Sequence, residues 1–238
     1  GGGIDLKFPH HDCEIAQSNG YTGHDPAKYW IHANMLTLNN KKMSKSTGNN
    51  ILPSDLFTGD NNIFSKAFDS NVIRFFFLQA HYRNVLDISD SALKASEKGY
   101  LRLIELINKV RNLDTSDNSN DKLLNELKDW EVRCFNCLND DFNTPMLIAE
   151  LFNSSKIIND FEQKIGDREK KYFLDLMDQF LNKILGIDYG ESNQINNDSV
   201  LEVLKEIRNE ARLDKNYDLS DKIRNKLSEI GINLNDKD

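Results

Sequence analysis

Residues 123–138 read LLNELKDWEVRCFNCL, and their apolar positions recur every three or four residues. Such spacing places the apolar side chains on one side of a helix, as in a helix packed within a bundle. The positions are Leu123, Leu127, Trp130, Cys134, Phe135 and Leu138. Similar stripes occur at 72–77, 93–107, 147–161 and 172–184. The chain is therefore predicted to be mainly α-helical from about residue 70 onward.

Residues that start and end helices support this prediction. Thr144 is expected to be an N-cap, with Pro145 at the first helical position, and Gly186 is expected to end the helix that passes through 172–184. Residues 190–198 are polar and predict a linker. Two helices are expected beyond it, at 200–211 and 220–230, followed by a short strand at 232–234.

The composition favours an ordinary globular protein. The net charge of −8 argues against a general nucleic-acid coat, although local basic patches can still hold RNA phosphates. The longest apolar run, residues 75–78, is too short to cross a bilayer, and three cysteines cannot form a disulfide framework. We therefore expect a cytoplasmic protein with no membrane partner.

The first sixty residues are rich in glycine, proline and histidine, which indicates loops around a site. Residues 31–38 are expected to form a short strand that leads into a turn at Asn39-Asn40. The turn is followed by Lys42-Met43-Ser44-Lys45-Ser46 and Thr47-Gly48-Asn49. Two ammonium groups three residues apart, interleaved with hydroxyls, suit a loop that neutralises charge on a triphosphate. A solvated basic turn is the alternative for a shorter motif of this kind.

A second cluster, Phe8-Pro9-His10-His11-Asp12-Cys13-Glu14, crowds imidazoles, a thiol and carboxylates together. If a helix begins after Pro9, His10 and Glu14 lie at i and i+4 on one face, close enough for one metal ion. Cys13 points to a different face, and two ligands do not complete a zinc site. The alternative is a hydrogen-bonded helix start.

Two further patterns have less specific interpretations. Gly1-Gly2-Gly3 followed by Asp5 suggests close backbone approach to a ligand, with a carboxylate for ribose hydroxyls, although the glycines can equally be a flexible end. Cys134 and Cys137 form a C-x-x-C, but Cys134 belongs to the apolar stripe of its helix. A buried structural thiol is therefore expected there.

Taken together, these motifs resemble the cysteinyl-tRNA synthetases. The stretches that carry the resemblance are residues 1–11, Glu14 to Ser18, Tyr29 to His32, Lys42 to Ser46, Ser70 to Phe76, Asp140 to Pro145 and Ile207 to Leu234. In this family Ser70 to Phe76 would begin the helical tRNA-binding domain named for its Asp-Ala-Leu-Arg signature. The resemblance covers essentially the whole chain, in order.

The resemblance implies roles for particular residues. His10 and Glu14 match two zinc ligands, whose partners in the family are two cysteines from earlier in the chain. Lys45 matches the lysine that contacts ATP, with Lys42 in support. The remaining matched positions are Ser44, Gly3 and Asp5 at the nucleotide and Trp30 and His32 in the amino-acid pocket. Core packing is an equal alternative for Trp30 and His32.

The resemblance also implies a reaction. ATP with Mg²⁺ and L-cysteine give cysteinyl-adenylate and pyrophosphate, and the terminal adenosine of tRNA(Cys) then attacks the mixed anhydride, takes the cysteine and releases AMP. The zinc, one per subunit, would bind the substrate thiolate, because a soft ligand preference separates cysteine from serine better than an apolar pocket does. A monomer is expected, and the candidate tRNA contacts in the last forty residues are Arg208, Arg212 and Arg224.

The expected architecture is a remnant of a Rossmann-like α/β nucleotide-binding catalytic domain at 1–65, a helical bundle at 66–190 and a small α(+β) tRNA-contacting module at 198–238. The chain lacks an initiator Met and the His-Ile-Gly-His type motif of class I enzymes, so it is predicted to begin inside the catalytic domain and to be inactive alone. The alternatives are a cysteine ligase that acts on a sugar amine and a non-catalytic tRNA-binding paralogue.

Overall fold

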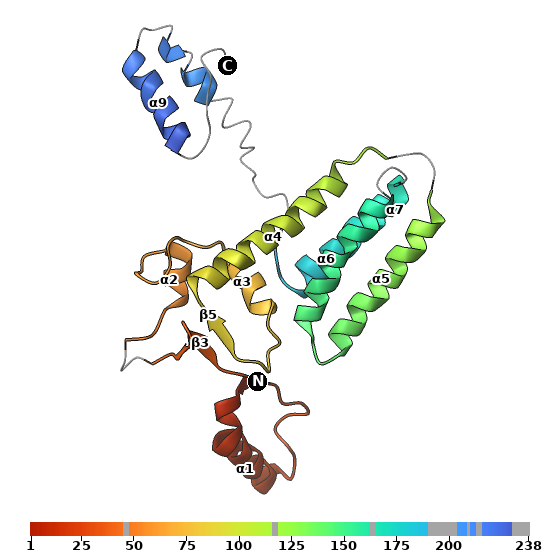
Figure 1. Ribbon diagram of the computed structural model, residues 1–238. Coiled ribbons are helices and arrows are strands. Elements are labelled where there is room, and N and C mark those ends of the chain that lie inside the picture. The colour runs from red at the N-terminus through yellow and green to blue at the C-terminus, as the bar shows by residue number, and fades with distance from the viewer. Residues whose placement is uncertain are drawn as a thin grey trace. The chain divides into compact units, whose positions relative to one another are not determined.

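Backbone contacts divide the chain into two units, residues 1–189 and 190–238, and each is considered by itself. The computed structural model describes residues 1–44, 48–115, 119–161, 165–189, 204–208, 210–212 and 216–229 (Figure 1). Lys45 and the predicted linker at 190–198 and strand at 232–234 lie outside these residues. No helix within the described segments is long and apolar enough to span a bilayer.

The first unit begins with a two-stranded parallel sheet. Strand β1 (Gly2–Gly3) pairs with β2 (His32–Ala33), Gly2 opposite His32 and Gly3 opposite Ala33. Between the strands lie a 3₁₀ turn, η1 (Ile4–Leu6), a π-helical turn, η2 (Lys7–His11), and helix α1 (Asp12–Thr22). No α1 residue is buried, so this helix contributes little to the core. The predicted strand over 31–38 is thus divided between β2 and β3.

A second sheet connects this segment to the helices. Strand β3 (Leu36–Leu38) lies between β4 (Lys41–Lys42), which is antiparallel to it, and β5 (Leu86–Ile88), which is parallel. Asn39 and Asn40 have φ of 52° and 60°, the left-handed conformation of a tight hairpin turn between β3 and β4. The turn predicted at Asn39-Asn40 is therefore confirmed.

A small core lies behind this sheet. Short helix α2 (Pro53–Thr58) and helix α3 (Ser70–Leu78) close over the strands. The buried side chains are Leu38, Leu56, Phe64, Phe68, Val72, Ile73, Phe76, Ile88 and Leu93. Helix α3 presents Val72, Ile73 and Phe76 to this core and Phe75 to the core of the following bundle, while Arg74 and Phe77 are left exposed.

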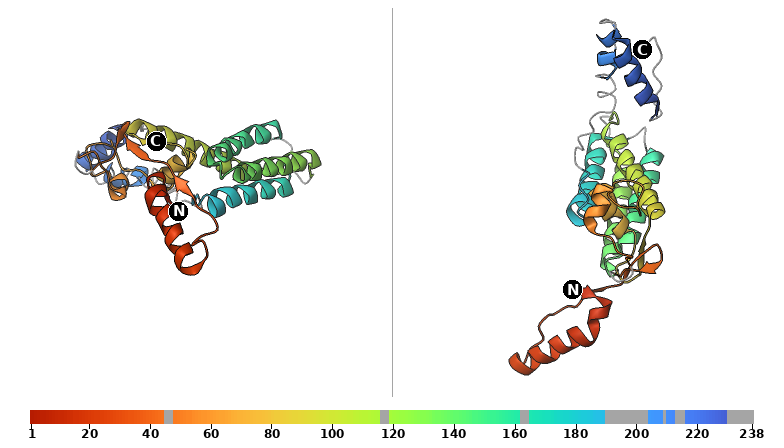
Figure 2. Two further views of the ribbon diagram at one scale, coloured as in Figure 1. Left: turned by 90° about the horizontal axis from the view of Figure 1, so that it is seen from below. Right: turned by 90° about the vertical axis from the view of Figure 1, so that its left-hand side faces the viewer.

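The helical bundle follows. It consists of α4 (Asp90–Arg111), α5 (Asp121–Asn139), α6 (Thr144–Phe161) and α7 (Asp167–Met177), which continues into the π-helical η4 (Asp178–Ile184). These helices lie side by side in Figures 1 and 2. The stripes at 93–107, 123–138, 147–161 and 172–184 supply buried residues of these helices, and the stripe at 72–77 belongs to α3. Three residues counted in the stripes, Phe77, Leu101 and Ile184, are exposed instead. Gly186, with φ of 65°, comes directly after the last turn, as predicted.

The first turn of α6 corrects one prediction. The Asn143 side-chain oxygen accepts a hydrogen bond from the Met146 amide at 3.3 Å, which is the N-cap arrangement. Asn143 is therefore the cap, Thr144 is already helical, and Pro145 is the second helical residue. Asp141 and Phe142, with φ of 53° and 55°, reverse the chain just before it and set this start.

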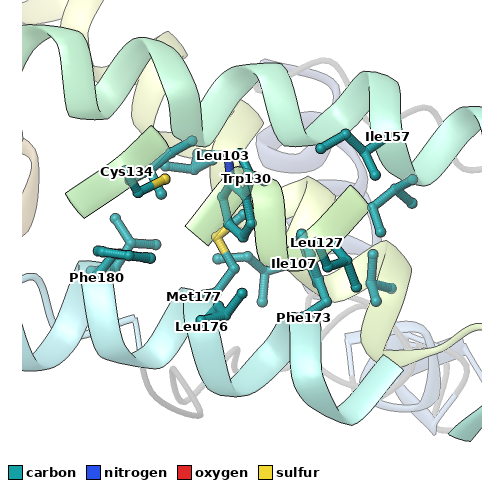
Figure 3. Packing of buried hydrophobic residues seen from close by; sticks show 14 of the residues in the cluster. Leu103, Ile107, Leu127, Trp130, Cys134, Ile157, Phe173, Leu176, Met177 and Phe180 are labelled. Carbon is teal, nitrogen blue, oxygen red and sulfur yellow. The ribbon is translucent and has the colours of Figure 1, made fainter. Parts of the chain in front are cut away.

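Trp130 lies at the centre of the bundle core. Its ring stacks on Phe173 at a centroid distance of 5.8 Å and meets Phe180 edge-on at 6.2 Å. Its indole N–H donates to the carbonyl oxygen of Glu150 on α6 at 2.8 Å. Figure 3 shows Ile107 and Met177 among the side chains around it. One residue of α5 thus joins α6, α7 and η4.

Cys134, one turn along α5 from Trp130, is fully buried, as predicted from its stripe. Burial raises the pKa of its thiol strongly. An inert, structural cysteine fits both observations.

The second unit contains helical residues 204–208 and 210–212 and helix α9 (Tyr217–Glu229). The helices expected at 200–211 and 220–230 are thus present over the described residues, with α9 beginning slightly earlier. Ala211, Ser220 and Leu227 are buried. They form part of the packing within this unit.

Candidate functional site

The pairing of β1 with β2 brings together three rings that are far apart in sequence. His11 Nδ1 lies 2.9 Å from His32 Nε2, a hydrogen bond between the two imidazoles. The Trp30 ring is 4.8 Å from that of His11 and lies nearly parallel to that of His32 at 6.3 Å. The His11 side chain is 9% exposed, whereas the Trp30 and His32 side chains are half-buried. We call His11, Trp30 and His32 the ring cluster.

The ring cluster has a mild electrostatic consequence. The pKa of His32 is lowered, first because the site partly excludes water and second because His11 lies beside it. The two nitrogens that face each other share one proton in a hydrogen bond. This hydrogen bond therefore needs one N–H donor and one acceptor nitrogen between the two rings.

The glycines at the start of the chain make this arrangement possible. A Cβ on Gly2 would lie 2.8 Å from His11 Cε1, so only glycine allows the imidazole to pack on the strand. A Cβ on Gly3 would collide with the Asp5 carboxylate, which folds back over the strand. Gly2 and Gly3 are therefore not a flexible end. The close approach at Gly2 is made by His11 of this chain rather than by a ligand.

Sequence reasoning singled out His10 and overlooked its neighbour. Helical conformation starts after Phe8, which is itself extended, so His10 and Glu14 do follow each other at helical spacing. Both side chains are exposed. His11, one residue on, turns inward to the ring cluster. The feature of the sequence that could have indicated His11 is Gly2-Gly3, because a strand without side chains leaves room for a ring to pack against it.

A metal site is only half present. His10 and Glu14 offer an imidazole nitrogen and a carboxylate, which are zinc ligands by chemistry. However, the described residues contain no group of three or more His, Cys, Asp or Glu side chains arranged for a metal ion. The pair therefore fits part of a tetrahedral site and does not complete one.

The second candidate region is the loop that follows β4. Ser44 N–H donates to the Asn49 carbonyl oxygen at 2.9 Å, and the Asn49 side chain donates to the carbonyl oxygens of Lys41 and Lys42 at 3.3 and 3.1 Å. Asn49 thus ties both ends of the loop together. Lys42 is exposed at its base, and Gly48 has φ of 69°. The described part of this region thus places exposed Lys42 beside a strand end that Asn49 holds in position.

The candidate RNA contacts in the second unit differ in exposure. Arg212 is exposed, while Arg208 is 2% exposed and cannot offer its guanidinium to RNA in this arrangement. The side chain of Arg224 lies outside the described structure. Arg212 is therefore the better placed of the two described arginines.

Comparisons with known proteins identify two matching families and several similar proteins. Residues 1–98 match the family described as tRNA synthetases class I (C) catalytic domain, and residues 135–189 match the DALR domain family. A cysteine–tRNA ligase of Parabacteroides distasonis is 39% identical over 243 residues, and one of Chlorobaculum tepidum is 41% identical over 248. Each alignment covers 99% of this chain. The chain spans about half the length of these curated relatives, 49% and 48% respectively.

A solved structure supports the fold alone. The LeuRS–tRNA–LeuAMS ternary complex of Agrobacterium radiobacter K84 matches with a TM-score of 0.57 at 17% sequence identity. The match covers 78% of this chain and 25% of that one. At this identity, the likeness concerns the course of the backbone.

Proposed function

We propose that this chain belongs to the cysteinyl-tRNA synthetase family and forms part of a cysteine–tRNA ligase, which activates L-cysteine with ATP and Mg²⁺ and transfers it to tRNA(Cys). The observation that carries the proposal is the 39% identity to a cysteine–tRNA ligase along 99% of the chain. The chain alone, about half of such a relative, is predicted to be inactive.

The architecture fits this assignment. The parallel pair β1–β2 is a small piece of the kind of sheet that a Rossmann-like catalytic domain contains. We keep the division into 1–65, 66–190 and 198–238 as a prediction. The bundle would serve as the tRNA-binding domain and the last segment as a further tRNA contact, with Arg212 in preference to Arg208. A monomer and a cytoplasmic location also remain predictions.

The loop between β4 and Asn49 is proposed to hold ATP. Lys42 and Lys45 would neutralise charge as pyrophosphate leaves, and the Ser44 hydroxyl would add a hydrogen bond. Asp5, folded over Gly3, is proposed to accept the ribose hydroxyls. Neither role needs a covalent nucleophile, because positioning and charge stabilisation are sufficient for adenylate formation.

The ring cluster is proposed to line the amino-acid pocket. Trp30 and His32 were expected there, and His11 is proposed as a third member because it fixes the orientation of His32 through their shared hydrogen bond. This rigid wall of rings would hold the substrate and limit its size. Core packing does not account well for it, since Trp30 and His32 remain half-exposed.

His10 and Glu14 are proposed to supply two of the ligands of a zinc ion. Zinc bound there would accept the substrate thiolate and so favour cysteine over serine. Two more ligands are needed that the described residues do not provide.

The proposal is tested with Lys42→Ala in the polypeptide encoded by the complete gene. Cysteine-dependent pyrophosphate exchange should fall by about 10- to 100-fold, since a preorganised positive charge at the reacting phosphates is lost. Lys41→Ala is the matched control, because Lys41 is the neighbouring exposed residue of the same strand. It should leave exchange within about twofold of the unmodified enzyme.

Three outcomes would contradict the proposal. Equal exchange in the two variants would remove Lys42 from the ATP site. Transfer of cysteine to a sugar amine, without specific binding of tRNA(Cys) in a gel-shift titration, would identify the sugar ligase. Specific tRNA binding without exchange by the complete polypeptide would identify a non-catalytic paralogue.

A further inference from the structure

One side of α3 is exposed and carries an arginine and an aromatic ring. While Val72, Ile73 and Phe76 enter the small core, Arg74 and Phe77 point to the opposite side. Phe77 is 39% exposed, unusual for a phenylalanine in the middle of a well-packed unit. This exposed side lies between two cavities, both of which Phe77 and Leu78 line.

The first cavity, of about 640 Å³, contains Arg74. It is also lined by Phe57, which is 47% exposed, by Gly186 and by the acidic residue Asp188. A Cβ on Gly186 would lie 3.1 Å from Arg74 Nη1, so the guanidinium rests directly on a backbone that carries no side chain. Arg74 makes no hydrogen bond or ion pair with the part of the chain that the structure describes. Its five donors are therefore available to an anionic ligand.

The second cavity, of about 420 Å³, is mostly apolar and has Phe142 at its edge. Phe142 is 59% exposed and has φ of 55°, a rare conformation for an aromatic residue. Preceding it, Asp141 also has a positive φ, of 53°. A strained turn that exposes a large ring points to a role outside packing.

Three side chains hold this turn in place. Asp141 accepts hydrogen bonds from the Tyr82 hydroxyl at 2.6 Å and from Arg83 Nη2 at 3.2 Å. His81 Nε2 lies 3.1 Å from the Asp141 carbonyl oxygen. Arg83 is still 62% exposed despite this pair. These hydrogen bonds to Asp141 thus hold Phe142 beside the cavity, and the Arg83 guanidinium also lies near it.

Aromatic rings that alternate with guanidinium groups suit one kind of ligand. Unstacked RNA bases bind by stacking on aromatic side chains, while arginines hold the adjoining phosphates. Paired RNA offers only backbone and groove, which would leave Phe77 and Phe142 without partners. Since the whole chain carries a net charge of −8, RNA must bind where local cations are free. Arg74 meets this condition.

We propose that the exposed side of α3 with its two cavities binds unstacked nucleotides of RNA, with Phe142 and Phe77 stacking on bases and Arg74 holding a phosphate. The proposal rests on the proposed function, which makes tRNA the RNA in question. The proposed contact lies in the first unit, whereas the arginines that the sequence suggested as tRNA contacts lie in the second. Both cavities lie within residues 1–189.

The test measures binding of two labelled probes, a tRNA(Cys) transcript and a single-stranded RNA hexamer, by fluorescence anisotropy. Phe142→Leu keeps an apolar side chain but removes the ring, and should weaken hexamer binding about fivefold or more. Phe142→Tyr keeps the ring and should bind as the unmodified chain does. This pair separates stacking from simple apolar contact.

Arg74→Ala should also weaken binding about fivefold and lower the salt dependence by about one phosphate contact. Arg168→Ala is its matched control, because Arg168 is a 61% exposed arginine on α7 outside both cavities. It should change affinity by less than about twofold. Far-UV circular dichroism confirms that each variant is folded.

The outcomes separate this inference from the proposed function. If Phe142→Leu and Arg74→Ala bind both probes as the unmodified chain does, the inference is wrong, whatever the tRNA specificity. If their defects persist with the hexamer but tRNA(Cys) binds no better than another tRNA, the inference holds and the proposed tRNA partner fails. If neither probe binds the unmodified chain, the inference is wrong, while the proposed function is still decided by cysteine-dependent pyrophosphate exchange in the complete polypeptide.

Discussion

Replacement of Trp130 tests the account of the bundle core. Its ring contacts Phe173 and Phe180, and its N–H reaches the carbonyl oxygen of Glu150, so α5, α6, α7 and η4 all depend on one side chain. Phenylalanine keeps a ring in the core and removes the N–H and part of the volume. Alanine removes nearly everything.

The expected loss of stability follows from these contacts. The hydrogen bond contributes about 1 kcal/mol net. A cavity of about 40 Å³ left by the smaller ring costs about 1 kcal/mol more, at roughly 24 cal/mol per Å³. Trp130→Phe should therefore lower the free energy of unfolding by about 2 kcal/mol, and Trp130→Ala by about 3–5 kcal/mol.

The measurement is urea unfolding followed by far-UV circular dichroism. Trp30→Phe serves as the control, because Trp30 is half-buried in the ring cluster and outside the bundle core. It should change the free energy of unfolding by less than about 0.5 kcal/mol. A loss for Trp130→Phe below about 0.5 kcal/mol, or equal to that of Trp30→Phe, would refute the assignment of Trp130 as the central residue of the core.

Three further predictions concern single residues. A thiol reagent should modify exposed Cys13 in the native protein, while Cys134 should react only on unfolding; rapid native labelling of both would contradict its burial. Arg83 lowers the pKa of Asp141 from 3.8 to about 2, with Tyr82 second, so its contribution is complete above about pH 4 and lost as pH falls toward 2. Asp141→Asn should remove that part of the pH dependence of unfolding, and identical acid curves would contradict the network. Gly59→Ala should cost about 2 kcal/mol or more in urea unfolding, because φ is 71° and the new Cβ would lie 2.5 Å from the Ala67 nitrogen; a neutral result would contradict this turn.

The bundle could be predicted because a helix repeats its buried face locally. Each apolar stripe needed only spacing of three and four residues, and most of its residues became buried, with Phe77, Leu101 and Ile184 as exceptions. The start of α6 could not be predicted to the residue. Asn143 and Thr144 are both good capping residues, and the choice depends on the turn at Asp141, whose positive φ is held by Tyr82 and Arg83 from a distant part of the chain. Nothing in the local sequence marks that turn, since it contains no glycine.

The ring cluster shows the same limit more sharply. Helical spacing predicts that His10 and Glu14 lie on one face, because both belong to one segment. It does not predict which of His10 and His11 is buried. That difference arises when β1 pairs with β2, thirty residues apart in register, and brings Trp30 and His32 against the helix start. Gly2 decides the outcome, because any side chain there would push the His11 ring away from the strand. Gly2 therefore leaves room for the His11 ring, and Gly186 in the same way leaves room for the Arg74 guanidinium.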